Sequence, residues 1–201
     1  MPRGQNLIVG LTGGMGCGKS TAAGLFAAQG FQRHDSDRHI RDVLYADPDV
    51  ITALVERLGP AVVGPDGAVR RERVAERVFA DDAALAWLED LLHPRLLAHW
   101  RRLFATGGPW IVEVPLLFEK GLENWFDFTV CVTAHSAVQL QRLEHRGMPA
   151  EAARRRLARQ MPLARKCELA DFVLLNDGTL EFLREQVESL SARLRGPEPT
   201  L

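Results

Sequence analysis

The stretch GGMGCGKS, residues 13–20, fits the pattern G-x-x-x-x-G-K-[ST] and decides the fold. An apolar run at Asn6–Leu11 leads into it, and apolar residues at helical spacing follow from Lys19 to Gln29. Glycines let a backbone approach an anion closely, and successive amides with a helix N-terminus can then enclose phosphate groups. The order of strand, loop and helix therefore predicts a phosphate-binding loop in an α/β protein.

Two side chains of this loop can act directly on a nucleotide. The Lys19 ammonium can reach the β- and γ-phosphates, and the Ser20 hydroxyl can hold Mg²⁺. The loop alone does not distinguish a switch GTPase, a motor ATPase and a small-molecule kinase, but the guanine motif N-K-x-D is absent from the sequence, which counts against a GTPase. ATP is the expected nucleotide. Cys17 is expected to be a small residue that fills space in the loop and contributes through its backbone N–H. The alternative is that its thiol is a nucleophile. The predicted nucleotide-binding residues of the loop are Gly14, Met15, Gly16, Cys17, Gly18, Lys19, Ser20 and Thr21.

Four further apolar runs alternate with helical patterns. The runs are Phe31–His34, Trp110–Phe118, Phe128–Thr133 and Phe172–Leu175. After the run at Phe128–Thr133, helical patterns lie near His135–Arg146, Pro149–Arg159 and Gly178–Arg195. Strands separated by helices favour a parallel sheet with right-handed crossovers. We therefore expect an α/β fold with a mainly parallel five-stranded sheet flanked by helices.

The segment 46–107 is too long for one crossover and is mostly helical in pattern. Asp35 is a candidate N-cap for a helix at Ser36–Tyr45, and a long amphipathic stretch runs from Asp81 to about Phe104. The segment 46–107 is therefore predicted to be a helical subdomain inserted into the sheet topology.

Composition restricts the class of protein. The chain has 201 residues, a net charge of -1 and 25% charged residues, which gives no argument for nucleic acid or an anionic membrane. No apolar run reaches the roughly 18 residues of a membrane span, and the N-terminus lacks a signal-peptide pattern. The three cysteines fit neither a disulfide framework nor a zinc site. We expect a reduced, cytoplasmic monomer with a frayed GPEPTL tail.

Two acidic positions are candidates for the chemistry. Transfer of a phosphoryl group to an alcohol needs a carboxylate near the acceptor hydroxyl. His34–Asp37 follows a predicted strand at the sheet edge where sites form, and Asp37 is the candidate base; both Asp35 and Asp37 could instead cap the next helix. Glu113 lies within an apolar strand, where a charge needs a partner, and it is a candidate ligand for a Mg²⁺-bound water.

With these motifs in view, the sequence resembles the dephospho-CoA kinase family over nearly its whole length. LTGGMGCGKST (11–21) is similar to that family's loop, with Cys17 where serine is usual and Met15 where isoleucine is common. HDSD (34–37) resembles its D-A-D element. Further elements follow in the family's order: DGAVRR (66–71) with Phe79, then LHP (92–94) and PLLFE (115–119). The last elements in this order are Gln160, Lys166, Ala170-Asp171, Asn176 and Gly178.

The resemblance implies ATP-dependent phosphorylation of the ribose 3′-hydroxyl of dephospho-CoA, the last step of CoA synthesis. It implies a P-loop kinase fold with a CoA-binding insertion at 46–107 and a helical lid at 139–166. Asp37 aligns with the residue regarded as the catalytic base, and Lys19 and Arg142 complete the predicted catalytic set.

Basic residues crowd the predicted lid. Arg142 and Arg146 share a helix face at i,i+4 spacing and are the best candidates to cover the transferring phosphate, with Arg159 a further one; a solvated basic face is the alternative. Asn176 is predicted to lie by the adenine, or in a turn.

Four residues are predicted to bind the acceptor besides Asp37, namely Arg71, His93, Leu116 and Glu119. Arg71 could instead form a surface ion pair, His93 could be a buried hydrogen-bonded histidine, and Glu119 could cap a helix. Two rival functions stay open. One is another P-loop small-molecule kinase, acting on a nucleoside monophosphate, shikimate or gluconate. The other is a regulatory ATP-binding module.

Overall fold

The computed structural model describes residues 6–158 and 160–196, which form two compact units. The first unit contains the chain up to Asp35 and from Thr106 onward, and the second contains Ser36–Ala105. The predicted frayed tail beyond Gly196 lies outside the described residues, as do Arg159 and the first five residues. Within the described ranges, no helix has both the length and the apolarity that crossing a membrane requires.

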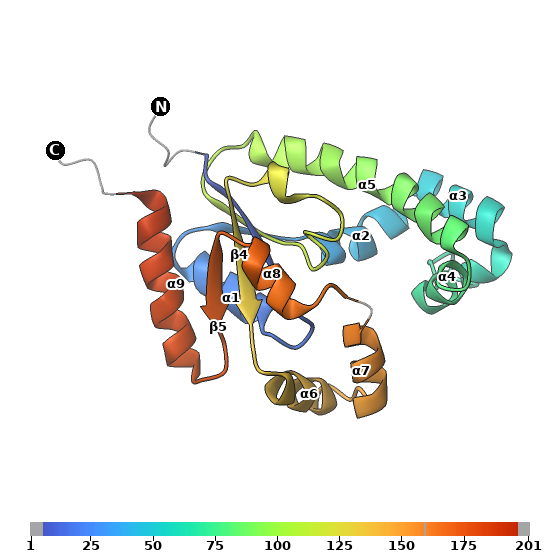
Figure 1. Cartoon of the computed structure of the whole chain (residues 1–201). Helices are drawn as coiled ribbons and strands as arrows, with labels where there is room; N and C mark the ends of the chain where they lie inside the picture. Colours follow the sequence, from blue (N-terminus) through green and yellow to red (C-terminus); the bar gives the residue numbers. More distant parts are fainter. Residues whose placement is uncertain (1–5, 159, 197–201) are drawn as a thin grey trace. The chain divides into compact units, whose positions relative to one another are not determined.

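The first unit is built on a parallel sheet of five strands, which confirms the predicted fold class (Figure 1). The strand order is β2-β3-β1-β4-β5, and each adjacent pair is parallel. The strands are β1 (Ile8–Gly13), β2 (Gln32–Asp35), β3 (Trp110–Glu113), β4 (Phe128–Thr133) and β5 (Phe172–Leu175). Strand β1 is central, with β3 on one side and β4 on the other. The strand order changes direction at β1, and ligands bind at such switch points of parallel sheets.

Helices cover both faces of this sheet. They are α1 (Lys19–Ala28), α6 (Ser136–His145), α7 (Ala150–Ala158), α8 (Leu163–Leu169) and α9 (Leu180–Arg195), with a short 3₁₀ turn at Glu123–Trp125. Helix α1 packs against α9 and against β1 and β3, whereas α8 packs on β1 and β4 and lies in front of the strands in Figure 1. The main core joins buried apolar side chains of β1, α1 and α9, including Val9, Phe26 and Leu183.

The second unit is helical. Its α-helices are α2 (Ser36–Asp42), α3 (Pro48–Leu58), α4 (Arg71–Val78) and α5 (Asp82–Phe104), and 3₁₀ turns occupy Leu44–Ala46 and Pro60–Val62. Asp47 and Asp81 cap α3 and α5 by accepting from the amides of Asp49 and Ala83, each at 2.9 Å. In α5, buried side chains recur every four residues from Ala84 to Phe104.

Two predicted elements end earlier in the structure than expected, and one helix was not predicted. The strand expected at Trp110–Phe118 ends at Glu113, because Pro115 has no amide hydrogen with which to continue the ladder. The helix expected at Ser36–Tyr45 ends at Asp42, and Asp35 is the last residue of β2, in register with Glu113. Helix α8 was not predicted as a separate element, because its seven residues are too few to show a clear period.

Candidate active site

The phosphate-binding loop joins the carboxyl end of β1 to α1 through backbone that only glycine adopts readily. Gly13 has a φ of 142° and Gly18 a φ of 91°. A Cβ at Gly13 would collide with the Val132 carbonyl oxygen, and one at Gly18 would collide with the Asn176 amide. The two glycines are therefore required both for backbone conformation and for space. The loop ends at Gly18, where α1 begins.

The Lys19 side chain turns back into the loop. Its Nζ donates to the carbonyl oxygens of Gly13 and Gly14, each at 3.0 Å. This places a positive charge beside the amides of the loop and at the N-terminus of α1, where an anion is favoured. The predicted role of Lys19 as a phosphate ligand fits this position.

A carboxylate with two partners lies beside the loop. Glu113, at the end of β3, accepts from the Ser20 hydroxyl at 3.0 Å through Oε2 and pairs with Arg33 at 2.7 Å through Oε1. The Glu113 side chain is 4% exposed, so it requires the hydrogen bonds that it receives. The predicted metal residues Ser20 and Glu113 therefore lie together. Their hydroxyl and carboxylate oxygens suit Mg²⁺, because this ion prefers oxygen ligands.

Arg33 was missed by sequence reasoning. It precedes the His34–Asp37 element by one residue, and only its pairing across the sheet to Glu113 reveals a role. Its guanidinium donates to Glu113 Oε1 through both Nε, at 2.8 Å, and a terminal nitrogen. This fixes one carboxylate oxygen and leaves the other directed at Ser20.

Arg142 and Asn176 hold the other side of the loop. The Arg142 guanidinium donates to the Asn176 carbonyl oxygen at 2.9 Å and to that of Gly16 at 3.4 Å. The Asn176 side-chain amide donates to the Cys17 carbonyl oxygen at 2.7 Å. Both residues are therefore brought to the loop, although they lie more than a hundred positions away in sequence.

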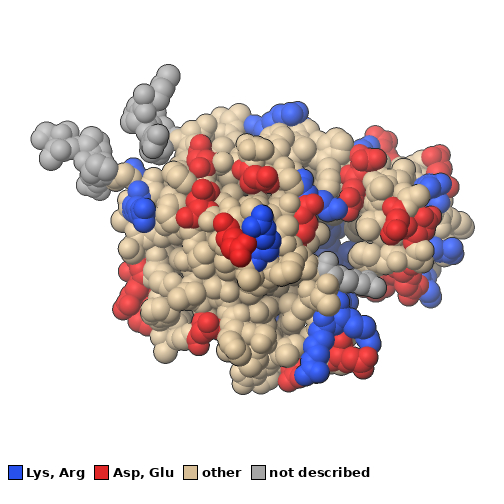
Figure 2. All heavy atoms as spheres, in the orientation of Figure 1, with Lys and Arg blue, Asp and Glu red and all other residues tan. Residues whose placement is uncertain are grey.

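The structure does not bring Arg146 to the same place. It follows the last residue of α6 and is exposed, and among the described residues it forms no ion pair or hydrogen bond with the loop. On the face shown in Figure 2, basic side chains gather over α7 next to acidic ones. Arg155 on α7 and Arg165 on α8 form exposed ion pairs with Glu151 and Glu168, as expected for a solvated face.

Burial raises the pKa of the Cys17 thiol above its usual value, although Lys19 opposes this shift. A protonated thiol is a poor nucleophile. Cys17 is fully buried inside the loop, so its contribution is its size and its backbone, as expected for a filler.

A buried ion pair anchors the PLLFE segment that follows β3. Lys166 on α8, with a side chain only 1% exposed, pairs with Glu119 at 2.8 Å and donates to the Pro115 carbonyl oxygen at 2.7 Å. Glu119 also accepts from the Met161 amide at 3.1 Å. Leu116, between these anchors, is 39% exposed. The sequence showed Lys166 only as part of a motif, without its partner.

Replacing Lys166 with methionine should destabilise the protein by about 3 kcal/mol, because it leaves the largely buried Glu119 carboxylate without its counter-ion. Arg165→Met in the same helix is the matched control. Its partner Glu168 is exposed, so the loss should stay below about 1 kcal/mol. Urea unfolding of the two variants measures the difference, and equal losses would contradict a structural role for the buried pair.

The remaining predicted residues lie in the helical unit. Asp37 is exposed in the first turn of α2, and His93 is half-buried in the middle of α5. Arg71 begins α4 and lines a hollow of about 340 Å³ within this unit. Arg41, Tyr45 and Asp66 also line this hollow, so it presents two guanidinium groups and one carboxylate.

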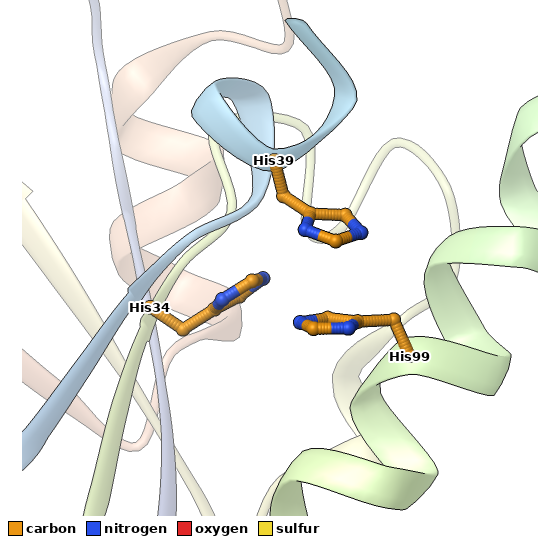
Figure 3. Close-up of side chains that lie close together, drawn as sticks. All are labelled: His34, His39 and His99. Atoms are coloured by element: carbon orange, nitrogen blue, oxygen red, sulfur yellow. The ribbon is translucent and has the colours of Figure 1, made fainter. Parts of the chain in front are cut away.

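Two histidines of this unit stack on each other. The rings of His39 on α2 and His99 on α5 have centroids 3.8 Å apart at an angle of 19° (Figure 3). Burial lowers the pKa of both side chains below the usual 6.5. The neighbouring Arg102 lowers both pKa values further, and His99 does the same to that of His39.

Stability should therefore fall in mild acid. Because the folded-state pKa of each histidine lies below that of the unfolded chain, the unfolded chain takes up protons first as the pH falls. The contribution of the neutral pair is complete above about pH 6.5 and is lost progressively below it. Thermal unfolding from about pH 7.5 to 5.5 measures this loss. His99→Gln should flatten the dependence, whereas His145→Gln, at an exposed position of α6, should leave it unchanged.

Comparison with known proteins matches the sequence of this chain to one family. The family model described as dephospho-CoA kinase matches residues 7–181. The chain belongs to the dephospho-CoA kinase family. The curated dephospho-CoA kinase of Syntrophotalea carbinolica is 37% identical over 203 residues, which cover 96% of each chain. That of Anaeromyxobacter dehalogenans is 39% identical over 195 residues, or 94% of this chain and 92% of the relative.

Solved structures share the fold of this dephospho-CoA kinase family chain. The crystal structure of TT1252 from Thermus thermophilus has a TM-score of 0.82 and 32% identity, and the match covers 94% of this chain and 98% of that one. Dephospho-CoA kinase from Campylobacter jejuni has a TM-score of 0.67 at 22% identity, over 91% and 94% of the two chains. A shikimate kinase from Bacteroides thetaiotaomicron, with a TM-score of 0.54 at 16% identity over 92% and 95%, shows the shared fold alone.

Proposed function

We propose that this chain transfers the γ-phosphoryl group of ATP to the ribose 3′-hydroxyl of dephospho-CoA, giving CoA and ADP. The observation that carries this proposal is the loop at residues 13–20 with Lys19 inside it and the Ser20–Glu113 pair beside it, in a chain matched to the family from residue 7 to 181. The protein is then a transferase that completes CoA biosynthesis.

The loop would hold the ATP phosphates through its backbone amides and the N-terminus of α1. Lys19 would exchange its bonds to the Gly13 and Gly14 carbonyl oxygens for phosphate oxygens. Arg142 already lies against Gly16 and Asn176, so it would stabilise the loop and add positive charge near the transferred group. In phosphoryl transfer the protein contributes mainly positioning and electrostatic stabilisation.

Ser20 and Glu113 would hold Mg²⁺, directly or through water. When bound, the ion neutralises charge on the β- and γ-phosphate oxygens. Arg33 would keep Glu113 in place, since it occupies the carboxylate oxygen that Ser20 does not contact.

Asp37 would accept or orient the proton of the acceptor hydroxyl. Its exposed position in α2 leaves the carboxylate accessible to a substrate. The helical unit would bind the CoA moiety, and the hollow lined by Arg41 and Arg71 is a suitable place for one of its acidic groups. His93, Leu116 and Glu119 are proposed to contribute to the acceptor site, Asn176 to the nucleotide site, and residues 139–166 with Arg146 to the lid.

The two rival functions are less well supported. A nucleoside monophosphate, shikimate or gluconate kinase would share the loop, but the L-H-P element at 92–94 and the family match are not expected of it. A regulatory ATP-binding module has no need of an acceptor site. The cytoplasmic location and the monomeric state remain predictions.

A panel of acceptors separates these functions. The protein is incubated with ATP and Mg²⁺ together with dephospho-CoA, AMP, shikimate or gluconate, and both ADP and the phosphorylated product are measured. ADP release should rise only with dephospho-CoA and should equal the CoA formed. Release that is equally fast with every acceptor would reject the proposal, and so would a preference for another acceptor.

A further inference from the structure

Two free cysteines that are 36 residues apart in sequence meet at one point of the fold. Cys131 lies on β4 and Cys167 on α8, and their sulfur atoms are 3.7 Å apart. Neither residue is part of the chemistry proposed above. We propose that Cys131 and Cys167 form a dithiol that a hydroperoxide converts to an intramolecular disulfide.

The geometry needs little change to form this bond. A disulfide brings the two sulfurs to about 2.05 Å, so the pair must close by less than about 2 Å from its present separation. Helix α8 packs directly on β4, so both cysteines lie on elements already in contact.

The two thiols differ in a way that sets the order of reaction. Cys131 is fully buried, and burial raises its pKa well above the usual value, so it stays protonated and is shielded from an oxidant. Cys167 is only half-buried and can meet a small peroxide. Cys167 is therefore the peroxide-reactive thiol, and Cys131 is the resolving one.

The reaction takes two steps. The Cys167 thiolate attacks one peroxide oxygen, and the O–O bond breaks to leave a sulfenic acid at Cys167 and hydroxide, which is protonated to water. The Cys131 sulfur then attacks the Cys167 sulfur, and the S–O bond breaks. The departing hydroxide takes the Cys131 proton and leaves as a second water. Two thiols are thus oxidised by two electrons, and one hydrogen peroxide is reduced.

The bond would connect two parts of the candidate active site. Strand β4 pairs with β1, which leads into the phosphate-binding loop. Lys166, the residue before Cys167, holds Pro115 and Glu119. A disulfide would therefore fasten the helix that carries Lys166 to the strand beside the loop. In a reducing compartment such a bond is transient, as a response to peroxide requires.

The test uses the full chain and hydrogen peroxide. After treatment the remaining thiols are alkylated under denaturing conditions, and intact mass and peptide masses are measured. The wild-type protein should lose the mass of two hydrogen atoms and keep one alkylatable cysteine, Cys17. A digest should give a peptide pair linked through Cys131 and Cys167 that separates on reduction.

Single variants test the order of the steps. Cys131→Ser should stop at a Cys167 sulfenic acid, which a cyclic diketone traps. Cys167→Ser, or Cys167→Ala if serine impairs folding, should leave Cys131 unoxidised. The proposal is overturned if both thiols of the wild-type protein remain alkylatable, if Cys17 takes part in the linkage, or if the linkage joins two chains. None of these readouts depends on kinase activity.

Discussion

Replacing Lys19 with methionine should lower the turnover of phosphoryl transfer at least about a hundredfold, the effect of losing one preorganised charge from a transition state. Lys19 is the side chain whose Nζ lies within the phosphate-binding loop, 3.0 Å from each of two loop carbonyl oxygens. Methionine keeps much of the length of the side chain but removes the charge. The loss should appear in kcat as well as in kcat/KM, because the charge acts on the opening β–γ bond.

Steady-state formation of CoA measures the effect, and thermal unfolding shows whether the variant folds. Lys19 is half-buried at the start of α1, so the variant should fold, with a stability loss of the size expected for its lost hydrogen bonds to the loop. If the folded variant turns over within a few-fold of the wild type, the loop does not bind the transferred phosphate as proposed.

Asp37→Asn should lower turnover by about 10²- to 10⁴-fold, the usual contribution of a general base. Asparagine has the same shape but cannot accept the proton of the acceptor hydroxyl. Asp37 is exposed in the first turn of α2, where a negative charge contributes about 0.3–1 kcal/mol, so the cost in stability should stay near that range. The pH dependence of kcat should also lose the limb that belongs to the base.

Asp42→Asn is the matched control, since Asp42 is the last residue of the same helix and pairs with Arg38 and Arg41 at the surface. It should keep turnover close to that of the wild type. An equal loss in both variants would mean that α2 tolerates no change of charge, and retained turnover in Asp37→Asn alone would remove the assignment of the base.

Local patterns were sufficient to predict most of the sheet. Phe128–Thr133 and Phe172–Leu175 were predicted with the bounds that the structure has, because each is a short apolar run between polar segments. The strand at Trp110 was predicted too long, since Val114, Leu116 and Leu117 continue the apolar run after the ladder has ended. Hydrophobicity alone therefore marks a strand more reliably than it marks its end.

Sequence likewise predicted some residues of the candidate site but not their partners. Lys19, Ser20 and the loop glycines follow from one contiguous motif, whereas Glu113 was inferred from the cost of a charge within an apolar strand. The partner that holds this charge, Arg33, lies 80 positions away, and no periodicity reveals such a pair. Lys166 likewise becomes informative only when the fold brings it to Glu119. Sequence thus revealed charges that need partners, and the fold revealed which partners they have.

The most direct test follows the γ-phosphoryl group itself. ATP with a radiolabelled γ-phosphate is mixed with an excess of the protein and dephospho-CoA, and the label is traced by chromatography; a 3′-deoxyribose analogue of dephospho-CoA serves as the comparison. The account predicts that the label appears in CoA with the natural acceptor and stays in ATP with the analogue. Label released as inorganic phosphate at the same rate with either compound, or transferred to the analogue, would contradict it.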